Sequence, residues 1–140
     1  MKLFFKKYWK IILWASILCL LSLGNTNKIP KIHRINIPHL DKIAHLGMYF
    51  IFSFLLYTSF SRGSAGKNFW KMTICLAITL FYGALMEILQ YLLTNYRTAD
   101  KYDMLFNSIG AVLGIIGYNI FYRIKLKKIM LLKLIISRHN

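Results

Sequence analysis

The sequence predicts an all-α fold, an integral membrane bundle of four transmembrane helices. The chain has 140 residues, 57% of them hydrophobic, and its mean hydropathy is +0.49. This composition is too apolar for a small soluble domain. Several apolar runs can cross a hydrocarbon layer of about 30 Å, which takes roughly 17 to 25 helical residues. We therefore expect residues 1–140 to form a single membrane domain.

Four apolar runs define the expected helices, at residues 8–24, 43–60, 72–93 and 104–122. The first run follows Lys2, Lys6 and Lys7 and so resembles a secretory signal, but no A-x-A-like cleavage site follows it. We interpret it as a retained helix. The basic tail, residues 123–140, mixes cations with large aliphatic residues. We expect an amphipathic extension that continues the fourth helix or lies along the inner leaflet.

The distribution of cations predicts the orientation in the membrane. With four spans, both termini and residues 61–71 share one side, and with Lys10 they hold thirteen of the nineteen Lys and Arg residues. An excess of cations marks the cytoplasmic side, so we predict cytoplasmic termini and a multi-pass protein of the bacterial cell (inner) membrane. The net charge of +15 also raises the question of nucleic acid. Because these cations flank apolar helices, we expect membrane lipids as partners and no nucleic acid.

The acidic residues are few and unevenly placed. The chain has four Asp and Glu residues, and three of them lie within residues 87–107. Glu87 would lie about 9 Å inside the outer end of the third helix. A charge at the bilayer centre costs about 2.5 to 3.5 kcal/mol on insertion scales, so Glu87 needs polar neighbours. A stripe with spacings of four, four and three residues supplies them on the same helix: Thr79, Gly83, Glu87 and Gln90.

Two other helices carry matching stripes. On the second, Asp41 and His45 lie four residues apart and Tyr49 follows one turn later. The fourth carries a polar mouth followed by small residues: Asp103, Asn107, Gly110, Gly114 and Gly117. Glycines at this spacing let membrane helices approach closely, and we interpret them as packing residues. Together the stripes predict a polar centre just beneath the outer face of the bilayer.

These residues also carry a family resemblance. The segments DKIAHLGMYF, GALMEILQ, the Arg at position 97 and DMLFNSIGAVLG resemble the VanZ-like family of small bacterial membrane proteins. The resemblance covers residues 41–114, with these polar and small residues in order: Asp41, Lys42, His45, Tyr49, Glu87, Gln90, Arg97, Asp103, Asn107, Gly110 and Gly114. Asn95 and Tyr96 stand where the family usually has Pro-Gly. The resemblance implies a multi-pass protein whose namesake is linked to low-level resistance to the glycopeptide teicoplanin, without a defined reaction.

The leading hypothesis is an outer-leaflet site that binds or processes a cell-envelope amphiphile, such as a lipid-linked precursor or a glycopeptide. The candidate catalytic residues are Glu87, Asp41, His45 and Asp103. A partly desolvated Glu87 can act as a general acid or base, and Asp41 can orient His45. The candidate substrate-binding residues are Gln90, Arg97, Asn107 and Tyr49, of which Arg97 suits an anionic group. No nucleophile stands out, so proton transfer is favoured over covalent catalysis.

Three alternatives remain open at this stage. The same groups could bind a ligand without chemistry. Asp41, His45, Glu87 and Asp103 could hold a divalent metal, because oxygen ligands and one imidazole suit several metals. The protein could also be a non-catalytic structural membrane protein in which the charged cluster latches the outer loops, with Arg97 paired to Asp103 or Glu87. The sequence identifies no cofactor and leaves open whether the protein is an enzyme.

Overall fold

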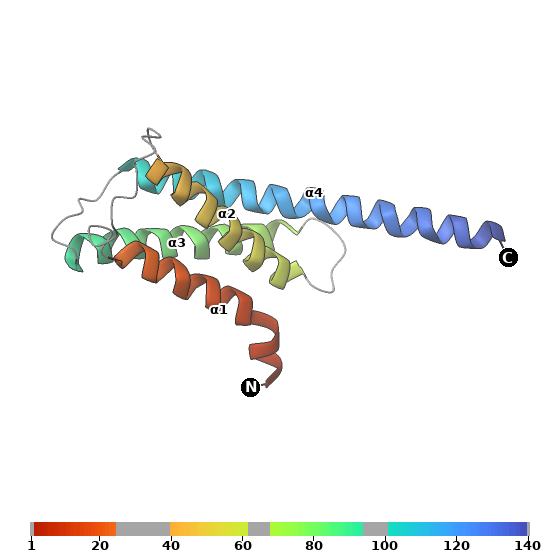
Figure 1. Cartoon of the computed structure of the whole chain (residues 1–140), viewed down its shortest axis with the longest axis horizontal. Coiled ribbons are helices and arrows are strands. Elements are labelled where there is room, and N and C mark those ends of the chain that lie inside the picture. The colour runs from red at the N-terminus through yellow and green to blue at the C-terminus, as the bar shows by residue number, and fades with distance from the viewer. Residues whose placement is uncertain (1, 25–39, 62–67, 94–100, 140) are drawn as a thin grey trace, which may run out of the picture.

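The computed structural model describes residues 2–24, 40–61, 68–93 and 101–139 (Figure 1). These residues form four helices, α1 (Lys2–Leu23), α2 (Leu40–Ser61), α3 (Phe69–Leu93) and α4 (Lys101–His139). The all-α prediction is confirmed. Each helix begins at least three residues before its predicted apolar run, because hydropathy marks where a chain is apolar and not where its helical hydrogen bonding starts.

Three helices are long and apolar enough to cross a membrane, over Asp41–Ser61, Phe69–Leu93 and Tyr102–Ser137. α1 is a fourth helix whose N-terminal half contains Lys6, Lys7 and Lys10 among its apolar residues. Large apolar side chains cover the outside of the bundle on all four helices, as expected for a surface that faces lipid tails. The fold is that of a multi-pass membrane protein.

Polar residues at three helix starts have a local structural role. The Asn68 side-chain oxygen accepts a hydrogen bond from the Lys71 backbone nitrogen at 3.2 Å and so caps α3. Asp41 and Asp103 lie in the first turns of α2 and α4. A carboxylate there is stabilised by the positive end of the helix dipole.

α2 and α4 form the most extensive helix pair of the bundle. A Cβ atom on Gly110 would overlap the Leu46 carbonyl, and one on Gly114 would overlap the Phe50 carbonyl and the Ser53 hydroxyl. The two backbones therefore touch at these positions, as in other small-residue contacts between membrane helices. The interpretation of these two glycines as packing residues is confirmed.

The polar stripe predicted on α3 faces the other helices. Thr79, Gly83, Glu87 and Gln90 are all buried, and Cys75 and Met86 complete the buried face of this helix. The neighbouring Phe81 and Ile88 are exposed, so the opposite face meets lipid. The helical spacing thus predicted which side of α3 faces the other helices.

α1 packs on α2 and α3 and is part of the bundle. Its Leu18 is fully buried. The Trp14 indole donates a hydrogen bond to the Met48 carbonyl on α2 at 3.0 Å, and the Tyr82 hydroxyl on α3 donates to the Ala15 carbonyl at 2.7 Å. In hydrocarbon such polar contacts hold neighbouring helices together.

The basic tail continues α4 without a break. The helix has 39 residues, and at a rise of 1.5 Å per residue it is about 58 Å long, well beyond a bilayer core of about 30 Å. Figure 1 shows α4 extending past the other three helices. Its cations point to several sides and alternate with exposed apolar residues, so the tail lacks the two separated faces expected of an amphipathic helix: Arg123, Lys125, Lys127, Lys128 and Lys133.

The glycine contact generates a stability prediction. Gly110→Ala should force α2 and α4 apart and lower the free energy of unfolding by about 1 to 3 kcal/mol, the usual cost of overpacking. Gly47→Ala is the matched control, because a Cβ atom there meets nothing within 4 Å. Thermal unfolding of both purified variants in detergent measures the difference. Equal melting temperatures for the two variants would contradict the close contact at Gly110.

Candidate functional site

A connected group of polar side chains lies where the first turns of α2 and α4 meet. His45 is only 4% exposed. Its Nδ1 lies 3.1 Å from Asn107 Oδ1, and its Nε2 lies 3.7 Å from Asp103 Oδ2. Lys42 Nζ lies 3.5 Å from Asp103 Oδ1. We call Lys42, His45, Asp103 and Asn107 the polar cluster.

Helical spacing and close backbone packing together build this cluster. Lys42 and His45 are three residues apart on α2, and Asp103 and Asn107 are four apart on α4, so each pair lies on one helix face. Gly110 lies one turn beyond Asn107 and holds the two backbones in contact. The two faces therefore meet at hydrogen-bonding range.

Two proton arrangements satisfy the contacts of His45. If Asn107 Oδ1 accepts from Nδ1–H, an ionised Asp103 beside Nε2 requires a second proton on the ring, which is then an imidazolium. If the Asn107 amide is turned, its nitrogen donates to Nδ1, and a neutral ring carries its proton on Nε2. The second arrangement gives the buried Asn107 nitrogen a partner and moves the Asn107 oxygen to the position that has no hydrogen-bond partner. In both, Nε2–H faces the carboxylate of Asp103.

α3 closes the third side of the cluster. A Cβ atom on Gly83 would lie 3.3 Å from the Tyr49 ring and 3.5 Å from the Asn107 amide nitrogen, so Gly83 lets both side chains approach α3. Glu87, one turn further along α3, is 8% exposed and lies within electrostatic range of Tyr49. Gly83 thus brings Tyr49 and Asn107 against α3, and Glu87 lies on the same buried face of this helix.

Gln90, predicted as a substrate-binding residue, makes a contact between helices. Its side-chain nitrogen donates to the Ser22 carbonyl at 3.0 Å. Ser22 lies in the last turn of α1, where carbonyl groups lack partners within their own helix. Gln90 therefore stabilises the end of α1 against α3.

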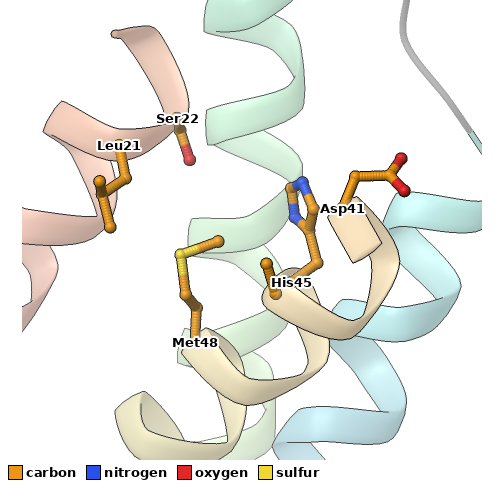
Figure 2. Close-up of a pocket in the computed structure, with 6 residues that line it drawn as sticks. Leu21, Ser22, Asp41, His45 and Met48 are labelled. Carbon is orange, nitrogen blue, oxygen red and sulfur yellow. The ribbon is translucent and has the colours of Figure 1, made fainter. Parts of the chain in front are cut away.

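A cavity of about 180 Å³ opens beside His45, between α1 and α2. Figure 2 shows Leu21 and Ser22 of α1 lying across from His45 and Met48 of α2. This volume is below the range of about 300 to 1,000 Å³ typical of small-molecule pockets, so it suits a small polar group or one end of a larger molecule. Sequence reasoning missed the α1 residues, because only the packing of α1 on α2 brings them here.

Asp41 lines the cavity beside His45, but it does not contact the His45 ring as we predicted. Its side chain is 58% exposed and comes no closer than 4.0 Å to Lys42 Nζ, and Figure 2 shows its carboxylate turned away from His45. The carboxylate beside His45 is that of Asp103, because the first turn of α4 packs against this face of α2. Lys42 was part of the DKIAH motif but not of the predicted site, although it contacts Asp103.

Two further hypotheses concern the same groups. Arg97, predicted to hold an anionic group or to latch the loops, lies outside the described residues. Within the part of the chain that the structure describes, no three His, Cys, Asp or Glu side chains are arranged to hold a metal ion. The proposed metal set of Asp41, His45, Glu87 and Asp103 does not form, since the Asp41 carboxylate points outward.

The apolar helices and their buried polar cluster define the class of protein, a multi-pass α-helical membrane protein with ionisable groups at one end of its bundle. The family model for VanZ/LLP1 matches residues 2–122, and the chain belongs to this family. Comparisons with curated proteins and with solved structures found no match. The resemblance stated from residues 41–114 is therefore confirmed, and it extends over α1.

Asp41 and Asp103 lie in the first turns of α2 and α4 but differ in their contacts, and this difference gives a second prediction. Asp103→Asn removes the negative charge shared by His45 and Lys42, and we expect it to lower the free energy of unfolding by about 1 to 3 kcal/mol. Asp41→Asn makes the same chemical change at an exposed position and should stay within about 0.5 kcal/mol of the parent. Thermal unfolding of the two purified variants in detergent measures both changes in stability. The assignment of Asp103 as the central carboxylate is wrong if Asp41→Asn is the more damaging change.

Proposed function

We propose that the polar cluster, with Glu87 and Tyr49, forms an extracytoplasmic site that binds the head group of a cell-envelope amphiphile and processes it by proton transfer. One observation carries this proposal. His45 is buried, is held by Asn107 and Asp103 of α4, and lines an open cavity between α1 and α2. The cavity leaves room beside His45 for part of a ligand.

The chemistry of the cluster suits an acid and base. A carboxylate beside Nε2–H fixes the orientation of the ring, as in acid–base sites where a third group orients the histidine. Positioned proton transfer typically contributes about 10²- to 10⁴-fold to a rate. Glu87 supplies another carboxylate, which is buried, on the neighbouring helix.

The lining of the cavity suits an amphiphile. Leu21 and Met48 offer apolar contacts, and His45, Ser22 and Asp41 offer polar ones. Because the cavity opens between two helices, a lipid-like molecule could enter sideways from the bilayer with its chain against the apolar residues. The family membership and the cation distribution support a role at the outer leaflet, with a lipid-linked precursor or a glycopeptide such as teicoplanin as the candidate ligand.

A structural role is the second candidate, and the mutual pairing within the cluster favours it. Asp103 contacts both Lys42 and His45, and Gln90 contacts the end of α1. Such contacts could serve only to fix the helices at this end of the bundle. The two roles differ in what a conservative change at His45 does to activity and to protein level.

The functional prediction concerns His45. His45→Gln keeps a polar side chain but removes the exchangeable ring proton, so turnover of a head-group-labelled lipid-linked precursor in proteoliposomes should fall about 100-fold or more. Teicoplanin susceptibility of bacteria that express the variant should rise in parallel. His139→Gln, the same change at the last residue of α4, is the matched control.

The outcomes separate the candidates. Loss of turnover with normal membrane levels supports catalysis, and loss of equilibrium binding without any turnover in the parent supports a binding site. Failure of His45→Gln to accumulate, while His139→Gln accumulates, supports the structural role. Normal level, binding and turnover in both variants would overturn the assignment to this cluster.

The orientation generates its own prediction. In a background with Cys19 and Cys75 replaced by Ser, a cysteine at the exposed position Tyr102 should react with an impermeant thiol reagent on intact cells. A cysteine at the exposed Lys125 should react only after lysis. Reversed labelling of the two positions would put the polar cluster on the cytoplasmic side and contradict an outer-leaflet site.

A further inference from the structure

Another cavity lies between α3 and α4, towards the end of the bundle opposite the polar cluster. It has a volume of about 230 Å³ and is lined by one residue of α3, Met72, and four of α4: Ile116, Asn119, Ile120 and Arg123. The four α4 residues follow each other within two turns at helical spacing, so they share one face. The cavity therefore has an apolar wall that leads to an amide and a guanidinium.

The guanidinium of Arg123 is open to a ligand. Arg123 is exposed, and among the residues that the structure describes none forms an ion pair, hydrogen bond or ring contact with its side chain. Asp103 lies twenty residues earlier on the same helix, about 30 Å away by helical rise. That distance is well beyond a screening length of about 8 Å. The carboxylate of the polar cluster therefore does not neutralise this cation.

Asn119 adds hydrogen-bonding groups to the same face. Its side-chain nitrogen donates to the Ile115 carbonyl at 2.9 Å. An amide carries two N–H groups and one acceptor oxygen, so one N–H group and the oxygen stay available to a ligand. Arg123 and Asn119 can thus donate together to an anionic oxygen.

The neighbouring residues place this cavity at the level of lipid head groups. Met72 lies in the first turn of α3, which begins with the exposed aromatic residues Phe69 and Trp70. Aromatic side chains of this kind are enriched where the hydrocarbon meets the head groups. Ile116 and Ile120 are exposed and lie deeper in the spanning part of α4 than Arg123. A cation at head-group level followed by exposed aliphatic residues matches an anionic head with an apolar tail.

We propose that Arg123 and Asn119 bind the phosphodiester head group of an anionic phospholipid, whose acyl chain lies along the apolar residues of the cavity. A guanidinium offers two parallel N–H donors that match two phosphate oxygens. The cavity is smaller than typical small-molecule pockets of about 300 to 1,000 Å³, so it takes the head group while the rest of the lipid stays in the bilayer. The predicted topology puts this end at the inner leaflet, where anionic lipids attract basic residues. The site is independent of the function proposed for the polar cluster.

The test uses the full-length protein purified in detergent and titrated with short-chain phosphatidylglycerol, with phosphatidylcholine of the same chain length as the lipid without net charge. Native mass spectrometry gives the dissociation constants. We expect phosphatidylglycerol to bind about tenfold more tightly than phosphatidylcholine, since bidentate charge-assisted hydrogen bonds are among the strong ones. Arg123→Gln should lose this preference. Arg123→Lys should retain part of it, because Lys keeps the charge but not the planar fork.

A charge-matched control separates a defined site from general attraction. Lys125 is also exposed but lies two residues further on, roughly 200° around the helix. Lys125→Gln removes the same charge as Arg123→Gln and should leave the preference for phosphatidylglycerol unchanged. Equal losses in these two variants, or equal binding of both lipids to the parent, would overturn the site. Inorganic phosphate that binds the parent as tightly as phosphatidylglycerol would overturn the lipid in favour of a free ion.

Discussion

Backbone contact between α2 and α4 at Gly110 and Gly114 is the constraint on which the rest of the structure depends. It brings the first turns of both helices so close that His45 reaches Asn107 and Asp103. With larger residues at these positions the helix faces would separate, and each polar side chain would lie against hydrocarbon without a partner. An unpaired polar group in that environment costs several kcal/mol. Close packing and polar pairing therefore support each other.

α3 and α1 build on this pair in different ways. α3 presents Gly83 to the cluster and adds the buried Glu87, so a third helix contributes an ionisable group. α1 is held by side chains that reach its backbone carbonyls, from Tyr82 at Ala15 and from Gln90 at Ser22. α1 is also held by the Trp14 indole at the Met48 carbonyl and by the buried Leu18. The cavity beside His45 therefore depends on where α1 packs.

The two ends of the bundle have opposite chemical character. One end buries carboxylates, an imidazole and amides against each other, and the other gathers lysines around an apolar hollow. The first arrangement suits proton exchange with a polar group, because its ionisable side chains are desolvated and paired. The lining of the second includes two lysines and no acidic residue.

The sequence by itself determined the helices, their membrane setting, the buried stripe of α3 and the packing role of Gly110 and Gly114, because helical period and hydropathy act locally. It also placed His45, Asp103 and Asn107 on the helix faces that meet in the polar cluster. Only the tertiary structure decided which carboxylate faces His45. Asp41 and Asp103 both lie in the first turn of a helix. The helical period of the sequence does not show which of the two carboxylates packs against the neighbouring helix and so reaches His45. The same holds for Gln90 and for the cavity, since both depend on where α1 packs.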